Sequence, residues 1–494
     1  MSSGGNEAVV LGIDIGTTAT KVVAGTRGGE IPHQTERGYS LRTDDSGEAV
    51  QDAAEVREAA VEALVECARW AAEDGRTVEA ISFSSAMHTL VGLDSAGEPV
   101  TPAFNWADSR AGEIAERLRA DRTAAAALHR ETGTPVHTQS VMVKLAWLTE
   151  AATELANGAV RWCSLKDHVF AALVDEFVTD HSMASGTGLQ EMAGLRWHEP
   201  ALEVAGITAD QLPELAAPTD TRPLSAEFAA KVGLPAGLPV VLGGGDGPLA
   251  NLGVGAVETG VAALSLGTSG ALRVVQEQPG VDERCRTFCY ALADGLWVVG
   301  GAVSNGGVVG QWASEVFGVD VGDLLEEALE VPAGADGLMA LPYLLGERAP
   351  WWQPGLTGSL VGLRRSHGRA EITRAAVEGV AQQLALVRDA VVEAGTEVSA
   401  VRATGGGLRS RLWPEAIAAS LGVDLELAEG SGGSGLGAVL LGWRALGELD
   451  SLEDVAEMVA PEGTVSPDPR AVKLMEQRRP VVQKLHEALS DLAL

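Results

Sequence analysis

Two turns rich in glycine and threonine have the composition of phosphate-binding loops. The first is Gly16-Thr17-Thr18, followed by Lys21, and the second is Gly267-Thr268-Ser269. Each lies between two short apolar stretches, which predicts a turn that joins two strands. Backbone N–H groups and hydroxyls in such turns donate to phosphate oxygens, and Lys21 would add positive charge. A hairpin without a ligand is the better interpretation of one copy alone, whereas the pair together favours phosphate binding.

Two carboxylates stand beside turns of this kind. Asp14 ends the apolar stretch before the first turn, where a carboxylate could hold Mg²⁺, often through water, against phosphate oxygens. Asp246 follows an apolar run and the glycines Gly243–Gly245. The glycines have no side chains, so Asp246 is the one carboxylate in this opening, as a general base requires. Capping is the alternative for both: Asp14 could cap its turn, and Asp246 could N-cap a helix with Pro248 in its first turn.

A third glycine-rich segment, Thr404-Gly405-Gly406-Gly407, runs on to Ser410. Glycines at the end of a strand leave a bare surface on which a nucleobase and ribose could lie. The segment lacks the spacing of the Rossmann fingerprint and of the Walker P-loop, so neither dinucleotide binding nor P-loop chemistry is supported. Close packing of a helix against a strand is the alternative interpretation.

The elements that must position these residues alternate between strands and helices. An amphipathic helix is predicted over 53–73, with Gly75 as its stop, because apolar residues recur there every three or four positions. The uncharged segment 295–314 is interrupted by glycines and polar residues, which favours a buried strand, a turn and a helix start over a membrane span. We expect an α/β fold. Further strands are predicted at 8–15, 20–24, 78–84, 238–242 and 261–266, and helices over 111–156 and 448–494.

The length of 494 residues predicts at least two domains. The segment Ile13–Thr18 resembles Leu264–Ser269, half a chain away, and each begins a long α/β segment, which favours duplicated domains over chance. We therefore predict domains at 1–254 and 255–494 that share a cleft, with the phosphate turns on either side of it.

The net charge of −32 and the pI near 4.6 make nucleic acid and anionic membranes unlikely partners. The hydrophobic fraction of 46% and the charged fraction of 21% are those of a folded protein rather than a disordered one. Met1–Glu7 has no features of a signal peptide, so a cytoplasmic location is expected. Four cysteines without a paired spacing, Cys67, Cys163, Cys285 and Cys289, predict reduced thiols.

Four sequence blocks, which include the turns and carboxylates above, resemble the FGGY carbohydrate kinases and occur in the order found in that family. These kinases have the actin/Hsp70/sugar-kinase fold. The resemblance spans nearly the whole chain. It implies two ribonuclease-H-like domains around a central cleft, with ATP in the cleft and phosphorylation of a sugar, polyol or sugar-acid hydroxyl by a base at Asp246. The blocks are Asp14–Lys21, Gly245–Gly247, Gly267–Gly270 and Thr404–Trp413. The nucleotide contacts that it implies are Thr17, Thr18, Gly267, Thr268, Gly307, Gln311, Gly406 and Ser410. Gly407 stands where alanine is usual, and Ser410 where glycerol kinases carry Asn.

The substrate loop is expected to contain Met87-His88, where glycerol kinases have Arg-Glu, so glycerol is disfavoured. Met-His resembles both the xylulose kinases and the gluconate kinases of the family, although a lone histidine is ordinarily structural. Trp106, Asp108 and Arg110 resemble the next substrate segment and would offer an apolar wall, an acceptor for hydroxyls and a cation. Four segments resemble gluconate kinases more than xylulose kinases, at 105–110, 180–188, 286–292 and 346–350.

Gluconate carries a carboxylate that xylulose lacks, so its pocket needs a further cation or donor. The candidates are Arg110, Lys144, Arg348 and His88, although Lys144 and Arg348 could pair with carboxylates of this acidic chain instead. The predicted reaction is ATP-dependent phosphorylation of D-gluconate to 6-phosphogluconate, with Mg²⁺ held by Asp14. A pentulose kinase for xylulose or ribulose is one alternative, and a non-catalytic nucleotide-binding protein of the actin/Hsp70 fold is another. By resemblance, a homodimer is expected.

Overall fold

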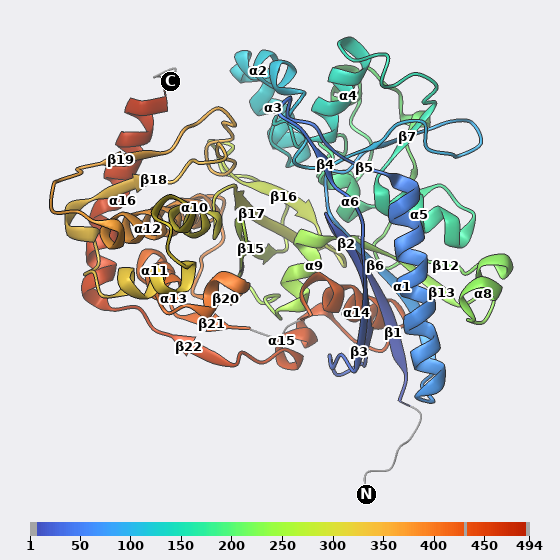
Figure 1. Cartoon of the computed structure of the whole chain (residues 1–494). Coiled ribbons are helices and arrows are strands. Elements are labelled where there is room, and N and C mark those ends of the chain that lie inside the picture. The colour runs from blue at the N-terminus through green and yellow to red at the C-terminus, as the bar shows by residue number, and fades with distance from the viewer. Residues whose placement is uncertain (1–6, 429–431, 491–494) are drawn as a thin grey trace, which may run out of the picture.

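The computed structural model describes residues 7–428 and 432–490, which form two lobes with one large sheet in each (Figure 1). The signal-peptide prediction rests on residues almost all of which lie outside the described part. In the first sheet, β1 (Val9–Ile15) pairs antiparallel with β2 (Ala19–Gly25) and parallel with β6 (Val78–Ser85). The full strand order is β12-β13-β6-β1-β2-β3, with β3 at His33–Gly38, β12 at Thr221–Pro223 and β13 at Pro239–Gly245.

The second sheet repeats this arrangement. Its strand β14 (Val261–Leu266) pairs antiparallel with β15 (Gly270–Gln276) and parallel with β20 (Ala400–Thr404). The order is β16-β17-β15-β14-β20-β21-β22, so β17, β15, β14, β20 and β21 occupy the places that β3, β2, β1, β6 and β13 occupy in the first sheet. The predicted α/β fold with two related halves is therefore confirmed. The other strands are β16 (Phe288–Ala291), β17 (Trp297–Val303), β21 (Leu425–Leu427) and β22 (Gly463–Val465).

Long helices pack on the outer faces of the sheets. The predicted helix over 53–73 is α1 (Ala53–Glu73), which begins where the Asp52 side chain accepts hydrogen bonds from the backbone N–H groups of Ala54 and Glu55. Its apolar stripe packs across β2 and β3. In the second lobe, α12 (Arg369–Glu393) packs in the same way on β15 and β17.

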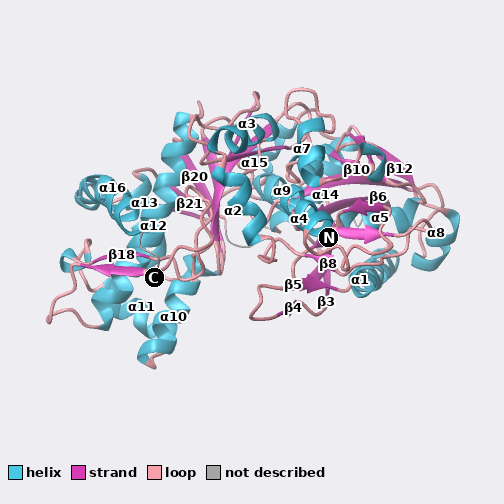
Figure 2. Cartoon of the chain, turned by 90° about the horizontal axis from the view of Figure 1, so that it is seen from above, coloured by secondary structure: helices cyan, strands magenta, loops and turns pink. Residues whose placement is uncertain are grey.

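Helix α14 (Gly433–Ala445) belongs to the second half of the sequence but packs on the sheet of the first half (Figure 2). The Trp443 indole N–H donates to the Gly25 carbonyl at 3.3 Å, and the Val439 side chain fills the space above Gly25. The helix thereby returns the chain to β1, which carries Asp14.

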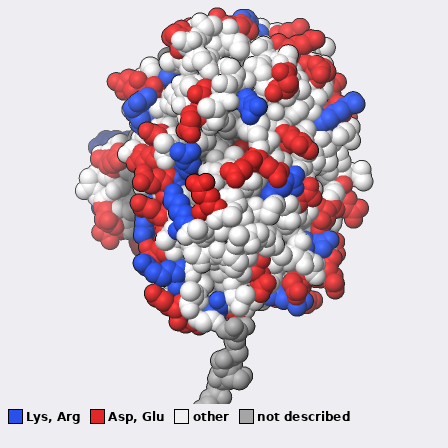
Figure 3. Space-filling view, turned by 90° about the vertical axis from the view of Figure 1, so that its right-hand side faces the viewer, with Lys and Arg blue, Asp and Glu red and all other residues white. Residues whose placement is uncertain are grey.

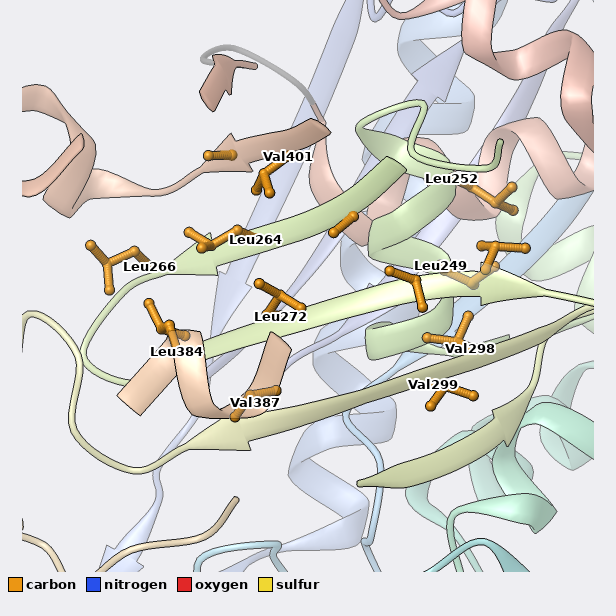
Figure 4. Close-up of a cluster of buried hydrophobic side chains, with 14 of the residues drawn as sticks. Leu249, Leu252, Leu264, Leu266, Leu272, Val298, Val299, Leu384, Val387 and Val401 are labelled. Atoms are coloured by element: carbon orange, nitrogen blue, oxygen red, sulfur yellow. The ribbon is translucent and has the colours of Figure 1, made fainter. Parts of the chain in front are cut away.

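Helix α9 (Asp246–Gly253) follows β13 of the first sheet and makes the reverse contact. Its side chains Leu249 and Leu252 point into the core of the second lobe (Figure 4). The neighbours drawn there come from β14, β15, β17, β20 and α12, and include Leu264, Leu272, Val299, Leu384 and Val401. Each lobe is therefore covered in part by a helix that comes after the strands of the other lobe in the sequence. The two sheets cannot separate without exposing hydrophobic core residues to water.

Glycine permits the close approach of α9 to α14. A Cβ atom on Gly437 would lie 2.0 Å from the carbonyl oxygen of Leu249, and a Cβ on Gly253 would lie 1.8 Å from that of Gly433. Both distances are far below van der Waals contact, so no other residue fits at either position without moving a helix.

The remaining elements surround the two sheets, and the segment at 295–314 forms β17 and the start of α10, as predicted. In the first lobe they are β4 (Arg42–Thr43), β5 (Ala49–Gln51), β7 (Val91–Leu93), β8 (Ala103–Phe104), α2 (Gly112–Ala120), α3 (Arg122–Thr132), α4 (Val141–Glu150), β9 (Arg161–Cys163), α5 (Leu165–Val174), β10 (Val178–Asp180), α6 (His181–Ser185), α7 (Glu199–Ala205), β11 (Glu214–Ala216) and α8 (Ala226–Val232). In the second lobe they are α10 (Val308–Phe317), α11 (Val321–Leu329), β18 (Met339–Leu341), β19 (Ser359–Val361), α13 (Leu412–Leu421), α15 (Val455–Met458) and α16 (Pro469–Ser490).

The expectation that 448–494 holds only helices is wrong. Gly463–Val465 form β22, because the free edge of β21 offers backbone partners to this short segment. Within the described ranges no helix has the length and apolar character to cross a membrane. All four cysteines are free thiols, as predicted. Figure 3 shows acidic side chains spread over one face of the first lobe, with basic side chains between them.

The substitution Gly437→Val tests the contact between α9 and α14. Its side chain would collide with the Leu249 carbonyl, and overpacking of this kind costs about 2–3 kcal/mol in the free energy of unfolding. Urea unfolding measures the loss. Gly463→Val is the matched control, because nothing lies within 4 Å of a Cβ at that position. Equal stability of the two variants would contradict this account of the packing.

Candidate active site

The parallel strands of the first sheet bring three predicted site segments to one edge. β1, β6 and β13 run in the same direction, so Asp14, Met87-His88 and Asp246 all lie at their carboxyl ends. The glycines before Asp246 have a packing role here: a Cβ on Gly243 would lie 1.9 Å from the Phe83 carbonyl oxygen, and one on Gly245 would lie 2.7 Å from the Met87 sulfur. Glycine therefore lets the loop after β6 lie directly against the residue before Asp246.

The two carboxylates interact with each other. Loss of water, together with the nearby charge of Asp14, raises the pKa of Asp246 to about 6, although the charge of Arg273 opposes this rise. Burial also raises the pKa of Asp14, although the Ser434 hydroxyl donates to its Oδ2 atom at 2.8 Å. Asp246 is the first residue of α9, and its Oδ1 atom accepts from the backbone N–H of Gly247 at 2.8 Å. The N-cap residue is Gly245, so the predicted capping alternative for Asp246 does not describe its place in the helix.

Hydrogen bonds from Tyr39 and Trp106 hold the first phosphate turn in place. The Gly16 N–H donates to the Ala19 carbonyl at 2.9 Å, and the Tyr39 hydroxyl donates to the Gly16 carbonyl at 2.7 Å. The Trp106 indole N–H donates to the Thr17 hydroxyl at 3.1 Å, while Thr18 is exposed. The turn is thus a preformed set of backbone and hydroxyl groups at the end of β1.

The side chain of Lys21 lies in a row of charges across three strands. It is opposite Asp14 on β1 and Glu36 on β3, and its Nζ atom is 3.9 Å from the Glu36 carboxylate. Its charge lowers the pKa of Asp14. Lys21 is therefore shared between two carboxylates.

The second phosphate turn joins the start of α10. The Gly306 N–H donates to the Thr268 carbonyl at 2.9 Å, and the Gly307 N–H donates to the Gly267 carbonyl at 2.7 Å. Gly405 has a φ of +124°, and a Cβ there would lie 2.2 Å from the carbonyl oxygen of Leu266. Glycine at this position brings the third predicted segment against the second turn.

The other predicted nucleotide residues lie around this turn. Gln311 on α10 and Gly406 are exposed, and no atom lies within 4 Å of a Cβ built on Gly406. The Ser410 hydroxyl is buried with no hydrogen-bond partner in the described part of the chain. A buried, unpaired hydroxyl beside an open glycine surface is consistent with a site for a polar ligand.

His88 is held as a neutral imidazole in the loop after β6. Burial and the nearby charge of Lys144 lower its pKa to about 3. Its Nδ1 atom is 2.8 Å from the Gly186 carbonyl oxygen, so the proton of the neutral ring lies on Nδ1 and Nε2 is an acceptor. The ring meets Tyr290 of the second lobe edge-on, with centroids 5.7 Å apart. A neutral acceptor suits a sugar hydroxyl and not a carboxylate.

Asp108 and Arg110 satisfy each other. The Arg110 guanidinium donates to the Asp108 carboxylate at 2.6 Å and to Glu48 at 2.9 Å, and it lies over the Trp147 ring at 5.0 Å. Asp108 is almost fully buried and also accepts from the backbone N–H of Ala49. This pair stabilises the loop that carries Trp106. The Arg110 guanidinium is already paired with two carboxylates, so it is not free to bind a substrate carboxylate.

Lys144 and Arg348 form no salt bridge within the described residues. Lys144 is buried, and its Nζ atom donates to the carbonyls of Gln139 at 2.7 Å and His88 at 3.3 Å. Burial lowers its pKa to about 7. The Arg348 guanidinium lies over the Trp106 ring at 5.0 Å, donates to the Val303 carbonyl and leaves its Nε–H without a partner. The charge of Asp108 acts on Lys144 and that of Glu347 on Arg348, but neither carboxylate is within salt-bridge distance in the described part of the chain.

Three residues of the site, Arg273, His137 and Gln139, were not in any sequence motif, and Tyr290 was part of the predicted segment 286–292 without a role assigned to it. Arg273 on β15 donates to Asn251 of α9 and to Ser265 of β14, each at 3.3 Å, and its charge lowers the pKa of Asp246. Tyr290, His137 and Gln139 each have a buried polar atom without a partner in the described structure. An arginine in a strand of apolar residues is an unusual signal that could have indicated Arg273, whereas His137 and Gln139 stand in no motif.

The strand before Asp246, β13, is held by a buried ion pair. The Lys166 Nζ atom lies 2.8 Å from the Asp180 carboxylate and donates to the Leu242 carbonyl on β13 at 3.1 Å. Asp180 begins α6, whose Ser182 hydroxyl accepts from the Gly245 N–H at 3.1 Å. This network fixes the end of β13 immediately before Asp246.

The chain matches the FGGY family of carbohydrate kinases, with the N-terminal domain at residues 9–253 and the C-terminal domain at 262–446. The chain belongs to this family, whose members are ATP-dependent carbohydrate kinases. The resemblance predicted from four blocks is confirmed, whereas the boundary between residues 254 and 255 stays a prediction.

Individual relatives include two substrate classes. A gluconokinase of Bacillus subtilis (strain 168) is 37% identical over 496 residues, which cover 98% of this chain and 96% of the relative. Solved structures of a gluconate kinase and of a ligand-bound xylulose kinase, both from Lactobacillus acidophilus, each superimpose with a TM-score of 0.93 at 32% identity. In both cases the match covers 98% of this chain and 99% of the other.

Arg273→Met tests the charge environment of Asp246. Loss of the positive charge is expected to raise the pKa of Asp246 above about 6, because the carboxylate loses a stabilising cation. The ¹³C NMR signal of the aspartate carboxyl carbons, assigned with Asp246→Asn, reports this pKa. Arg374→Met is the matched control, since Arg374 is equally buried but pairs with Glu378 on α12. An unchanged or lower pKa in Arg273→Met would overturn this interpretation.

Proposed function

We propose that the protein phosphorylates D-gluconate on its terminal hydroxyl with ATP to give 6-phosphogluconate. The observation that carries the proposal is a pair of cations near His88, Lys144 and Arg348, that form no salt bridge among the described residues. Asp14 and Asp246 lie at the ends of β1 and β13, and the charges of Asp246 and Glu347 also act on Arg348. A linear sugar acid fits this arrangement, with its hydroxyl at Asp246 and its carboxylate toward the cations.

In the proposed mechanism, Asp246 is the general base. An alcohol is a weak nucleophile near pH 7, and a carboxylate with a pKa of about 6 is ionised there and basic enough to accept the hydroxyl proton. Arg273 keeps this carboxylate charged despite its loss of water. The neutral His88 ring accepts a hydrogen bond from a sugar hydroxyl and orients the chain of the substrate. Phosphoryl transfer then depends on positioning and on donors for the phosphate oxygens.

The two turns are proposed to hold the phosphates of ATP. Thr17 and Thr18 present donors from the first lobe and Gly267 and Thr268 from the second, and the exposed surface at Gly406 would receive the nucleoside. Sites of this kind exclude water when the lobes close, which limits hydrolysis of ATP.

Asp14 is the residue proposed to hold Mg²⁺. Among the described residues no cluster of three histidine, cysteine or acidic side chains forms a ready metal cage. This agrees with the usual Mg²⁺ site, in which one or two carboxylates act together with water and phosphate oxygens. Burial raises the pKa of both carboxylates, and the charge of Asp14 raises that of Asp246, so a cation bound between them would stabilise their ionised forms. When bound, Mg²⁺ neutralises phosphate charge.

A pentulose kinase is the second candidate. The xylulose kinase structure superimposes as well as the gluconate kinase structure does, and a neutral His88 suits any polyol. The cytoplasmic location and the homodimer stay predictions.

A panel of sugars separates these candidates. ADP release, coupled to a spectrophotometric assay, is measured with gluconate, xylulose, ribulose and glycerol. We expect kcat/KM for gluconate to exceed that for each of the others by about tenfold or more, the effect of one charged hydrogen bond. A preference for xylulose or ribulose would overturn the gluconate proposal, and release unaffected by any sugar would favour a non-catalytic protein.

Asp246→Asn tests the base. We expect sugar phosphorylation to fall about 10²- to 10⁴-fold, because the amide cannot accept the proton, while ATP binding measured by fluorescence stays within about twofold. In the unaltered enzyme, kcat/KM should fall about tenfold for each pH unit below the pKa of Asp246. Asp389→Asn is the control, because Asp389 on α12 pairs with Arg479 on α16. Near-normal turnover of Asp246→Asn would contradict the assignment.

A further inference from the structure

The segment before α4 faces the second lobe at the cationic end of the sugar site. His137 is buried, and its ring meets the Trp352 ring edge-on, with centroids 5.9 Å apart. The backbone of Trp352 makes two further hydrogen bonds. Its carbonyl accepts from the Arg119 guanidinium at 2.6 Å, and its N–H donates to the Arg348 carbonyl. His137 therefore lies where the first lobe meets the loop that carries Arg348.

The hydrogen bonds of His137 decide which of its nitrogens donates. Its Nδ1 atom accepts from the backbone N–H of Gln139 at 3.2 Å. In the neutral ring the proton must then be on Nε2, which makes Nε2–H a donor. That atom is buried and has no partner in the described structure. His88 has the opposite arrangement, since its Nδ1 lies against a carbonyl and its Nε2 is an acceptor.

Other unpaired groups share this end of the site. The Gln139 side chain has a buried Oε1 atom without a partner, and Arg348 has a buried Nε–H without one. The Lys144 ammonium binds the Gln139 carbonyl, so its charge lies beside the same segment. Burial lowers the pKa of His137, and all the charges that act on it are positive or become positive on protonation: Arg119, Arg348, Lys144 and His88. Glu347, which is buried beside Arg348, and Asp108, whose charge acts on Lys144, are the acidic groups near these cations. Neither carboxylate forms a salt bridge with Lys144 or Arg348 in the described part of the chain, so both cations can still receive an anion.

We propose that His137, with Gln139 beside it, is the specificity-determining part of the site that receives the carboxylate of the sugar acid. The Nε2–H of His137 donates to one carboxylate oxygen, while Arg348 and Lys144 supply the positive charge. His88 binds a hydroxyl nearer to Asp246. This inference deepens the proposed function and rests on it, because it requires that the substrate carries a carboxylate.

The test compares two substrates that differ only at that end. D-Glucitol has the carbon chain of D-gluconate with a hydroxymethyl group in place of the carboxylate. In His137→Phe, which keeps a ring against Trp352 but removes the donor, we expect KM for gluconate to rise about 10- to 100-fold, the effect of one hydrogen bond to a charged group. The kcat for gluconate and the KM for glucitol should stay within about threefold. The matched control is His168→Phe, because His168 on α5 is also buried with an unpaired Nε2 atom but faces Arg57 away from the site.

A second variant decides the matter if His137→Phe does not fold. Gln139→Glu changes the shape of the side chain very little but adds a negative charge that repels the carboxylate and competes for Lys144. We expect KM for gluconate to rise at least about tenfold with little change for glucitol. Values for gluconate within twofold of the unaltered enzyme in the folded variants would overturn the inference. Failure of the gluconate proposal itself is seen separately, as a preference of the unaltered enzyme for an uncharged sugar.

Discussion

The packing of α9 against α14 is the contact on which both halves of the site depend. Asp246 is the first residue of α9, and Ser434, in the first turn of α14, donates to Asp14. The two helices approach closely only because Gly437 and Gly253 lack side chains. The same contact thus sets the positions of both carboxylates. Because the apolar face of α9 lies in the core of the second lobe, Asp246 is tied to that lobe as well as to β13 of the first.

The charge of the protein and the charge of its site have opposite effects. A net charge of −32 repels anions from the surface, yet a carbohydrate kinase must bind ATP. Surface charges act over a Debye length of about 8 Å at physiological salt, so they weaken quickly inside the molecule. Lys144, Arg273 and Arg348 lie in or near the site, where their charges are screened less. Local placement of a few cations therefore outweighs the acidic surface.

Much of the site could be predicted from the sequence. The phosphate turns, Asp14, Asp246 and the Met87-His88 loop all stand at strand ends, where the pattern of apolar residues and glycines is distinctive. Other features could not be predicted. The spacing around Asp108 makes Arg110 look like a free cation, but Glu48, some sixty residues earlier, folds against it. The glycines Gly243–Gly245 suggest an open backbone, whereas they admit Phe83 and Met87.

By itself the sequence determined the local elements, the repeat of two α/β halves and the family. These follow from short-range spacing: apolar residues every two or every three to four positions, and glycines that end each element. Only the tertiary structure decided the charge state and the orientation of the reacting groups. Whether His88 accepts and His137 donates depends on carbonyl and N–H groups that folding brings to each ring, and the pKa of Asp246 depends on water lost to both lobes. Burial and long-range partners are properties of the assembled molecule, and no local pattern in the chain encodes them.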